Sequence, residues 1–247
     1  MLGLPTGIQA CLFDLDGVLT DTAAVHAAAW KEMFDEFLRD YAAQHGIAFQ
    51  AFDARAEYDA YVDGKPRANG VRDFLTARGI TLPEGTADDP PSALTVNGLG
   101  NRKNEAVQRR IRTEGVHVFE GSRRYLQAAE KAGLRRAVVS SSANTREVLD
   151  VTGLAQYVEQ IVDGVTIRTE GLKGKPAPDT FLAAAKGFGL EPSQAAVYED
   201  ALAGVSAGRA GHFGYVIGVD RVGQAADLKS HGADVVVQDL AELMENQ

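Results

Sequence analysis

The sequence predicts an α/β protein whose core is a doubly wound parallel sheet, interrupted after its first strand by a small α-helical insertion. From Val118 onward, strand-like and helix-like segments alternate, which is typical of a parallel sheet with helices on both faces. Between the first strand and that region, helical patterns recur without a convincing β-run. We therefore expect a core domain of residues 1–22 and 116–247 and an α-helical cap domain of residues 23–115.

The first expected strand is the apolar segment of residues 8–13, which ends abruptly in Asp14 and Asp16. A short apolar run fits a strand covered on both faces, and ligands of open α/β sheets bind beyond the carboxyl ends of the strands. The two aspartates would then stand at the edge of a site. A plain turn is an equal alternative, because Gly17 can adopt positive φ and aspartate caps backbone amides.

The insertion is expected to be built from helices. Helical patterns occupy residues 25–44, 54–62, 70–78 and 101–114. A connection rich in Pro, Gly and Asp lies near residues 83–91. Because the insertion follows the first strand, its inner face is expected to cover the strand ends that carry Asp14 and Asp16.

The rest of the core is expected to alternate between helices and strands. Helices are expected at residues 122–131, 145–151, 179–188 and 202–210, and strands at residues 136–140, 160–163, 195–198, 215–219 and 235–237. The first strand joins the same sheet. Polar residues that follow these strands are therefore candidates for a shared site.

One such group follows the strand at residues 136–140. Ser140, Ser141, Ser142 and Asn144 place hydroxyls and an amide at a strand-to-helix junction, where they suit phosphate oxygens. Helix capping is the alternative interpretation. For Ser142 or Asn144 taken alone, capping is the better explanation.

A lysine and two further acids complete the set. Lys175 lies in a loop that two prolines stiffen before a helix. Most lysines are merely solvated, but this rigid loop could hold an ammonium group beside carboxylates or phosphate. Glu199 and Asp200 end another buried strand, and singly they could be the acidic start of a helix. Carboxylates gathered from two strand ends repel one another unless a hard cation binds them, and oxygen-rich sites suit Mg²⁺. The set predicts a Mg²⁺ site at which an aspartate could attack a phosphate ester.

The composition argues against several classes of protein. A formal net charge of −9 argues against general nucleic-acid binding, but local cations could still hold a small phosphorylated ligand. No apolar run is long enough to span a membrane, and the amino terminus lacks the features of a signal peptide, so we expect a cytoplasmic protein. The single cysteine, Cys11, is expected to be a buried structural thiol.

Four ordered segments carry a family resemblance. They read Phe-Asp-Leu-Asp-Gly-Val-Leu-Thr-Asp-Thr, Val-Val-Ser-Ser-Ser, Gly-Lys-Pro-Ala-Pro-Asp and Tyr-Glu-Asp-Ala-Leu-Ala-Gly. Their order resembles the haloacid dehalogenase (HAD) superfamily, in its phosphatase and phosphomutase branch. The match spans nearly the whole chain, and four ordered motifs are far more specific than one. It implies a Rossmann-like core with a small α-helical cap.

The resemblance also implies roles for the strand-end residues. Asp14 would be the nucleophile, Asp16 the general acid/base, and Ser140 and Lys175 would hold the transferring phosphoryl group. An aspartate at the first position favours phosphoryl transfer over dehalogenation. The implied Mg²⁺ ligands are the Asp14 side chain, the Asp16 backbone carbonyl, Glu199 and Asp200.

Within the superfamily, the chain most resembles the β-phosphoglucomutase group. His26 would lie near Asp16 and help to couple the protonation of Asp16 to closure of the cap. Arg67 would bind the phosphate that is not transferred. In the loop of residues 140–144, this chain has Ala143 at the position where the resemblance leads us to expect a lysine. The implied substrate- and phosphate-binding residues are Thr22, Gly64, Arg67, Lys103, Ser140, Ser141, Ser142, Asn144 and Lys175.

The implied substrates are a phosphorylated hexose and a sugar 1,6-bisphosphate, exchanged through an aspartyl-phosphate enzyme. A sugar-phosphate phosphatase is the main alternative, because it would use the same residues and release the phosphoryl group to water. A noncatalytic sensor of phosphorylated ligands should lack the nucleophile or the lysine, and both are present. The oligomeric state is not readable from the sequence, and a monomer is compatible with it.

Overall fold

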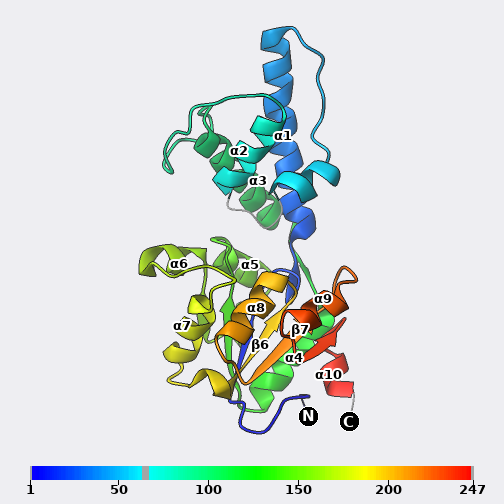
Figure 1. Cartoon of the computed structure of the whole chain (residues 1–247), viewed down its shortest axis with the longest axis vertical. Helices are drawn as coiled ribbons and strands as arrows, with labels where there is room; N and C mark the ends of the chain where they lie inside the picture. Colours follow the sequence, from blue (N-terminus) through cyan, green and yellow to red (C-terminus); the bar gives the residue numbers. More distant parts are fainter. Residues whose placement is uncertain (1, 63–66, 246–247) are drawn as a thin grey trace. The chain divides into compact units, whose positions relative to one another are not determined.

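The computed structural model describes residues 2–62 and 67–245, which form two compact units (Figure 1). The α/β unit consists of Met1–Thr22 and Val116–Gln247, and the helical unit consists of Ala23–Gly115. Within the described residues, no helix is long and apolar enough to cross a membrane.

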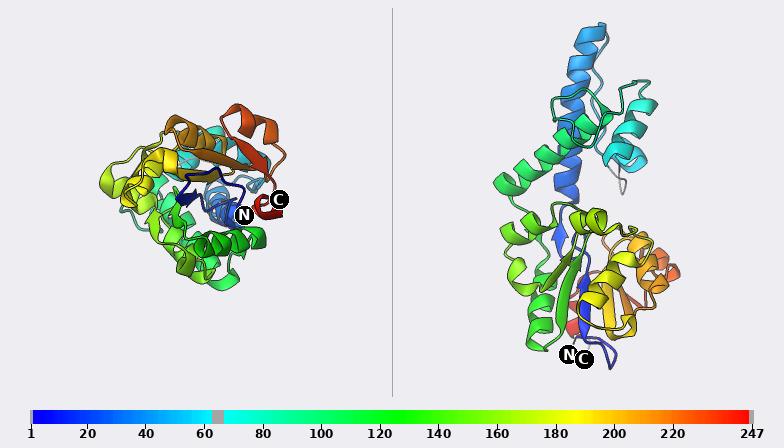
Figure 2. Two further views of the ribbon diagram at one scale, coloured as in Figure 1. Left: turned by 90° about the horizontal axis from the view of Figure 1, so that it is seen from below. Right: turned by 90° about the vertical axis from the view of Figure 1, so that its left-hand side faces the viewer.

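A six-stranded parallel sheet forms the centre of the α/β unit (Figure 2). In spatial order its strands are β5 (Gln160–Val162), β4 (Arg135–Val139), β1 (Ala10–Phe13), β6 (Ala195–Glu199), β7 (Tyr215–Val219) and β8 (Val235–Val237). Phe13 of β1 pairs with Val138 of β4 and with Tyr198 of β6. The residues that follow these three central strands therefore emerge at the same edge of the sheet.

The remaining elements of the α/β unit surround this sheet. Its helices are α4 (Glu120–Lys131), α5 (Thr145–Val151), α6 (Gly164–Glu170), α7 (Asp179–Gly187), α8 (Leu202–Ala210), α9 (Ala225–Ser230) and α10 (Glu242–Glu245). Two 3₁₀ turns span Ala155–Tyr157 and Pro192–Gln194. A separate antiparallel pair joins β2 (Thr20–Asp21) to β3 (His117–Val118).

Successive residues of β1 face opposite sides of the sheet, and both sides are covered. Leu12 packs in a cluster with Phe181 of α7 and Val205 of α8. On the other side, Phe13 meets Tyr125 of α4 edge to face, with ring centroids 6.2 Å apart. Because both faces are buried, the strand reads as an unbroken apolar run. The predicted α/β class with a doubly wound parallel sheet is confirmed. The predicted burial of Cys11 is confirmed as well.

The sequence patterns do not predict α6, which has only seven residues. Its start is fixed by the buried side chain of Asp163, which accepts hydrogen bonds from the amides of Val165 and Thr166 at 3.1 and 2.8 Å. It ends at Gly171, which adopts the left-handed conformation. Caps, rather than an apolar periodicity, define this helix.

The helical unit packs around an aromatic core. Its elements are α1 (Ala23–His45), a π-helical turn (Tyr58–Val62), α2 (Arg67–Ala77) and α3 (Val96–Glu114). The ring of Phe34 on α1 lies between two other rings. Its centroid is 5.3 Å from that of Trp30, also on α1, and 4.0 Å from that of Phe74 on α2. The last helix begins five residues before the predicted start, at Val96 instead of residue 101, because Thr95 caps it by accepting the amide of Gly98 at 2.9 Å.

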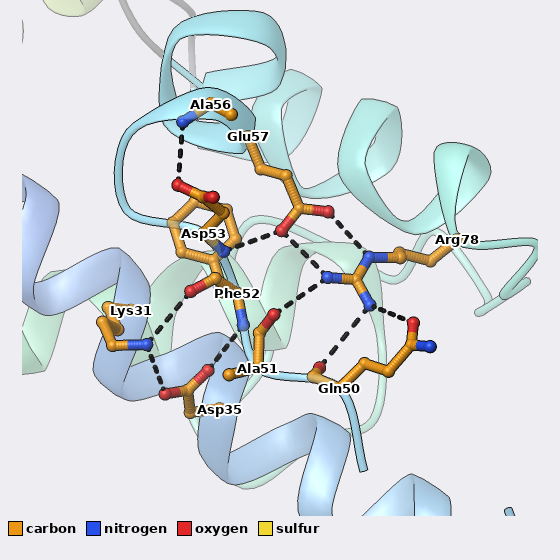
Figure 3. Close-up of polar contacts among 9 residues, drawn as sticks. All are labelled: Lys31, Asp35, Gln50, Ala51, Phe52, Asp53, Ala56, Glu57 and Arg78. Atoms are coloured by element: carbon orange, nitrogen blue, oxygen red, sulfur yellow. Dashed lines mark hydrogen bonds and ion pairs between the residues drawn. The ribbon is translucent and has the colours of Figure 1, made fainter. Parts of the chain in front are cut away.

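Two ion pairs fix the connection between α1 and the π-helical turn (Figure 3). Asp35 accepts the amide of Phe52 at 2.7 Å, while Lys31 donates to Asp35 at 2.9 Å and to the Phe52 carbonyl at 3.0 Å. Nearby, Arg78 forms a two-point pair with Glu57 at 2.7 and 2.9 Å. Since both polar groups of Phe52 are held, its buried ring stays in the aromatic core.

Candidate active site

An ammonium group and three carboxylates meet at the carboxyl edge of the central strands. Asp14 directly follows β1, Glu199 ends β6, and Asp200 comes next. Nζ of Lys175 lies 2.5 Å from Oδ1 of Asp14 and 2.6 Å from Oε1 of Glu199. It also donates to the Val139 carbonyl, at the end of β4, at 3.0 Å. One buried cation therefore bridges three neighbouring strands.

The charges of this cluster shift the pKa values of its members. Burial acts to lower the pKa of Lys175, but Asp14 and Glu199 outweigh it and raise that pKa above its usual range. Burial raises the pKa of Glu199, and Asp14 adds to the effect while Lys175 opposes it. Burial and the neighbouring acids raise the pKa of Asp200. Ionising Glu199 and Asp200 together beside Asp14 is therefore unfavourable, even with Lys175 close by.

The three carboxylates form a donor set that fits a divalent metal ion. Asp14, Glu199 and Asp200 each offer one oxygen, and these oxygens all lie within 4.8 Å of one another. Carboxylate oxygens are the ligands that hard divalent cations prefer. A cation bound among them would offset the repulsion between the acids, which adds to burial in raising the pKa of Glu199 and Asp200.

Two glycines allow the acidic side chains to approach the backbone closely. A Cβ atom at Gly17 would lie 1.9 Å from Oδ2 of Asp200, and one at Gly204 would lie 1.8 Å from Oε1 of Glu199. Gly17 also has a φ of 84°, which other residues rarely adopt. Its amide donates to the Thr20 carbonyl at 2.7 Å, so the Asp-Gly pair forms the turn considered above. The same turn brings Gly17 against Asp200.

Asp16 lies on this turn, and its side chain is held by Thr22, the residue at which the first segment of the α/β unit ends. The hydroxyl of Thr22 donates a hydrogen bond to Oδ1 of Asp16. The Asp16 carboxylate is also one of the charges that raise the pKa of Asp200. Thr22 therefore orients the carboxylate that is the candidate general acid/base.

The loop after β4 is organised by its own hydroxyls. Oγ of Ser140 accepts the amide of Ser142, and Oγ of Ser142 accepts the amide of Asn144, both at 3.1 Å. The Thr145 hydroxyl donates to the Ser142 carbonyl at 2.8 Å, and Asn144 stands at the N-cap of α5. Ser140 is buried, whereas Ser141 is exposed. The hydroxyls of Ser140 and Ser142 therefore accept amides of their own loop, whereas the side chain of Asn144 makes no capping hydrogen bond to α5.

The predicted supporting residue His26 and the predicted substrate-binding residues Lys103 and Arg67 lie near one another in the helical unit. Nζ of Lys103 lies 2.8 Å from Nδ1 of His26 and 4.9 Å from the centre of the Trp30 ring. Burial, together with the charges of Lys103 and Arg67, lowers the pKa of His26 to about 3. His26 is therefore neutral near neutral pH and accepts a hydrogen bond from the buried Lys103.

Arg67 opens α2 and donates to the Gly100 carbonyl at 3.4 Å, which ties the start of α2 to α3. Gly64, predicted to bind substrate, lies outside the described residues. The predicted coupling of His26 to Asp16 stays a prediction, because the two residues belong to different units.

A comparison with family models decides the family. Residues 8–212 match the model of haloacid dehalogenase-like hydrolases, and this match includes Asp14, Lys175 and both later acids. The chain belongs to the haloacid dehalogenase-like hydrolase family.

Relatives of this haloacid dehalogenase-like hydrolase have two kinds of activity in their names. A beta-phosphoglucomutase from Mycobacterium bovis is 59% identical over 247 residues, covering 99% of this chain and 94% of the relative. Hexitol phosphatase A from Escherichia coli is 30% identical over 202 residues, covering 81% of this chain and 77% of the relative. A crystal structure of beta-phosphoglucomutase from Clostridium difficile has a TM-score of 0.71 at 25% identity, covering 96% of this chain and 93% of that one.

Sequence reasoning missed the residues of this haloacid dehalogenase-like hydrolase that support the site through backbone groups. Oγ of Ser122, on α4, donates to the Val18 carbonyl at 2.6 Å and so holds the turn after β1. Ser122 is completely buried. A serine in the first turn of a helix is ordinary, so no local signal marks this contact.

Proposed function

We propose that this chain is a magnesium-dependent β-phosphoglucomutase that interconverts β-glucose 1-phosphate and β-glucose 6-phosphate. The observation that carries the proposal is the 59% identity over 99% of the chain to a protein named for that activity. The cluster around Asp14 and Lys175 supplies the chemistry that the activity requires. In this proposal the α/β unit transfers the phosphoryl group, and the helical unit is the cap that selects the substrate.

Asp14 is the proposed nucleophile. Lys175 donates a hydrogen bond to one of its oxygens at 2.5 Å, which fixes the orientation of the carboxylate. A carboxylate oxygen attacks a phosphorus of the sugar bisphosphate, and the bond from that phosphorus to the sugar oxygen breaks. Asp16 gives its proton to the leaving oxygen. The products are an aspartyl-phosphate and a sugar monophosphate.

The second half of the reaction reverses these roles. Asp16 takes the proton from the 6-hydroxyl of β-glucose 1-phosphate, and the hydroxyl oxygen attacks the phosphorus held by Asp14. The bond between Asp14 and phosphorus breaks and gives the 1,6-bisphosphate. After this intermediate reorients, its 1-phosphoryl group passes to Asp14 and β-glucose 6-phosphate leaves.

The Mg²⁺ would be held by the carboxylates of Asp14, Glu199 and Asp200 and by the backbone carbonyl of Asp16. When bound, it offsets negative charge on the acids and on the transferring phosphoryl group. Lys175 and Ser140 are the proposed contacts of that group on the protein. Ser140 directly follows β4, and Lys175 is held by Asp14, Glu199 and the Val139 carbonyl, so little rearrangement is needed during transfer.

The pH dependence of stability tests the metal assignment. In the folded protein, burial and neighbouring acids raise the pKa of Glu199 and Asp200. Above the ordinary carboxyl pKa of about 4, the folded state therefore keeps protons that the unfolded chain has released, and the stability contributed by the cluster falls as the pH rises. Mg²⁺ binds the ionised acids, so we expect it to raise Tm more at about pH 8 than at about pH 5.

Thermal unfolding in MgCl₂ and in EDTA at both pH values measures this difference. An equal rise in Tm at the two pH values would remove these acids from the proposed metal site.

A mutase must also hold the phosphate that is not transferred. Arg67 and Lys103 are proposed for this role in the helical unit, and Ser142 and Asn144 in the loop after β4. Ala143 supplies no cation to that loop. The proposal therefore places most of the electrostatic attraction for this phosphate on the helical unit.

Replacing Arg67 with alanine is expected to lower kcat/KM of the mutase reaction by about 100-fold, because a charged contact to the second phosphate is lost. Hydrolysis of a small ester with one phosphate, such as p-nitrophenyl phosphate, should be nearly unchanged. Arg72→Ala, on the same helix, is the matched control. An equal loss of both activities in Arg67→Ala would mean that Arg67 is structural, acting through Gly100.

A sugar-phosphate phosphatase is the second candidate, and the similarity to hexitol phosphatase A favours it. The same residues would form the aspartyl-phosphate, and water would attack it in place of a sugar hydroxyl. The two functions differ in how well the closed enzyme excludes water from the aspartyl-phosphate. Incubation with Mg²⁺, β-glucose 1-phosphate and a trace of the 1,6-bisphosphate should give glucose 6-phosphate without matching free phosphate. Stoichiometric phosphate release would establish the phosphatase instead.

A further inference from the structure

The loop between β7 and α9, residues 220–224, contacts both turns that carry the acidic residues. Nε of Arg221 donates to the Gly17 carbonyl, on the turn after β1, at 2.7 Å. Nε2 of Gln224 donates to the Asp200 carbonyl, after β6, at 3.0 Å. Both residues lie outside the four motifs described above. A single loop therefore ties together the two strand ends that supply Asp14 and Asp200.

This loop is itself fixed to the sheet. The amide of Asp220 donates to the Val237 carbonyl of β8 at 2.8 Å. Oδ1 of Asp220 accepts the amides of Gly223 and Gln224 at 2.7 and 2.8 Å. An aspartate that accepts amides from its own turn closes the turn and restricts its backbone. The side chains of Arg221 and Gln224 therefore start from a well-defined backbone.

The guanidinium group of Arg221 has three further contacts, the longest of which is the donation from Nη2 to the Val18 carbonyl at 3.5 Å. Nη1 donates to the Gln238 carbonyl at 2.7 Å, and the guanidinium carbon lies 3.6 Å from the centre of the Phe119 ring. A planar group held by a carbonyl and an aromatic face has little freedom to rotate. Its Nε is therefore aimed at Gly17.

The two turns held by this loop touch each other. The space for a Cβ atom at Gly17 is filled by the Asp200 carboxylate, whose Oδ2 would lie 1.9 Å from it. A shift of either backbone by a few tenths of an ångström would therefore change the distance between the carboxylates of Asp14 and Asp200. Groups that orient metal ligands affect binding even though they do not touch the metal.

We infer that Arg221 and Gln224 are positioning residues, which hold the turn after β1 and the Asp200 backbone at the spacing that the carboxylates need to bind a divalent cation. They act through the carbonyls of Gly17 and Asp200 and touch no reacting atom. The inference rests on the proposed Mg²⁺ dependence of the chain.

The first test replaces Gln224 with methionine, which keeps the length of the side chain and removes its donor. Titration calorimetry with MgCl₂ alone should show an Mg²⁺ affinity about tenfold weaker than that of the wild type. The control is Gln156→Met. Gln156 is exposed and also donates its amide to a backbone carbonyl, that of Gly153 at 2.8 Å, so its replacement should leave Mg²⁺ binding unchanged.

The second test compares Arg221→Met with Arg221→Lys. Methionine removes every donor, so we expect kcat of the mutase reaction to fall about 10-fold to 100-fold with little change in the KM for sugar phosphate. Lysine keeps one donor that can reach Gly17, and it should restore part of both kcat and Mg²⁺ affinity. Arg209→Met, at an exposed site on α8, is the control.

If Gln224 and Arg221 had a purely structural role, Gln224→Met and Arg221→Met would both have a lower Tm and a wild-type affinity for Mg²⁺. That result would overturn the inference. If Arg221→Met does not fold, Gln224→Met decides the question. A wild-type protein that does not bind Mg²⁺ would refute the metal assignment and this inference together. Normal wild-type binding with unchanged variants would refute the inference alone.

Discussion

Replacing Asp14 with asparagine is expected to abolish both phosphomutase and phosphatase turnover, with kcat lowered by at least about 10⁴-fold. Asparagine keeps the size of the side chain, but its neutral amide cannot attack phosphorus as a carboxylate does. Both activities depend on the same first step, so both should be lost. Assays of glucose 6-phosphate formation and of p-nitrophenyl phosphate hydrolysis measure the two losses.

A control separates lost chemistry from lost folding. Asp150→Asn, at an exposed position of α5 in the same unit, should retain both activities. Asp14→Asn should unfold cooperatively, as the wild type does. Substantial turnover by folded Asp14→Asn in either assay would remove Asp14 as the nucleophile.

Replacing Lys175 with methionine is expected to have the next largest effect. The substitution removes the cation that lies 2.5 Å from Asp14 and 2.6 Å from Glu199. Breaking a buried ion pair by deleting one partner costs about 3 to 5 kcal/mol of stability. Losing a preorganised charge beside the transferring group should also lower kcat by about 10² to 10³-fold.

Denaturant unfolding and the mutase assay measure these two effects separately. Lys186→Met, at an exposed position of α7, should change neither stability nor kcat appreciably. If Lys175→Met lost stability but kept wild-type kcat under conditions where it is folded, the lysine would have only a structural role.

The fold could be predicted where local pattern and tertiary burial agree. The residues of β1 are all fully buried, so the strand is marked by an unbroken apolar run that no turn interrupts. Elements that no apolar pattern marks could not be predicted. The helix α6 depends on the Asp163 cap, and β2 and β3 have two residues each, too few to carry a periodicity.

The candidate site could be located because parallel strands end at one edge of a sheet. That rule places Asp14 and Glu199 at neighbouring strand ends. It does not place Lys175, which comes from a loop. The prolines of that loop make the lysine a candidate, and only the family resemblance implies its role. The rule also could not identify Arg221 or Gln224. These residues contact backbone carbonyls, and because every residue type has a carbonyl, the sequence does not reveal the partner.

The central claim is that Asp14 carries the phosphoryl group and returns it to a sugar hydroxyl. The most direct measurement loads the protein with ³²P from labelled β-glucose 1,6-bisphosphate in Mg²⁺ and then adds unlabelled β-glucose 1-phosphate or buffer. We expect the label on Asp14 to pass to sugar much faster after β-glucose 1-phosphate is added than it passes to water in buffer. Label that appears as inorganic phosphate at the same rate in both cases would contradict the account.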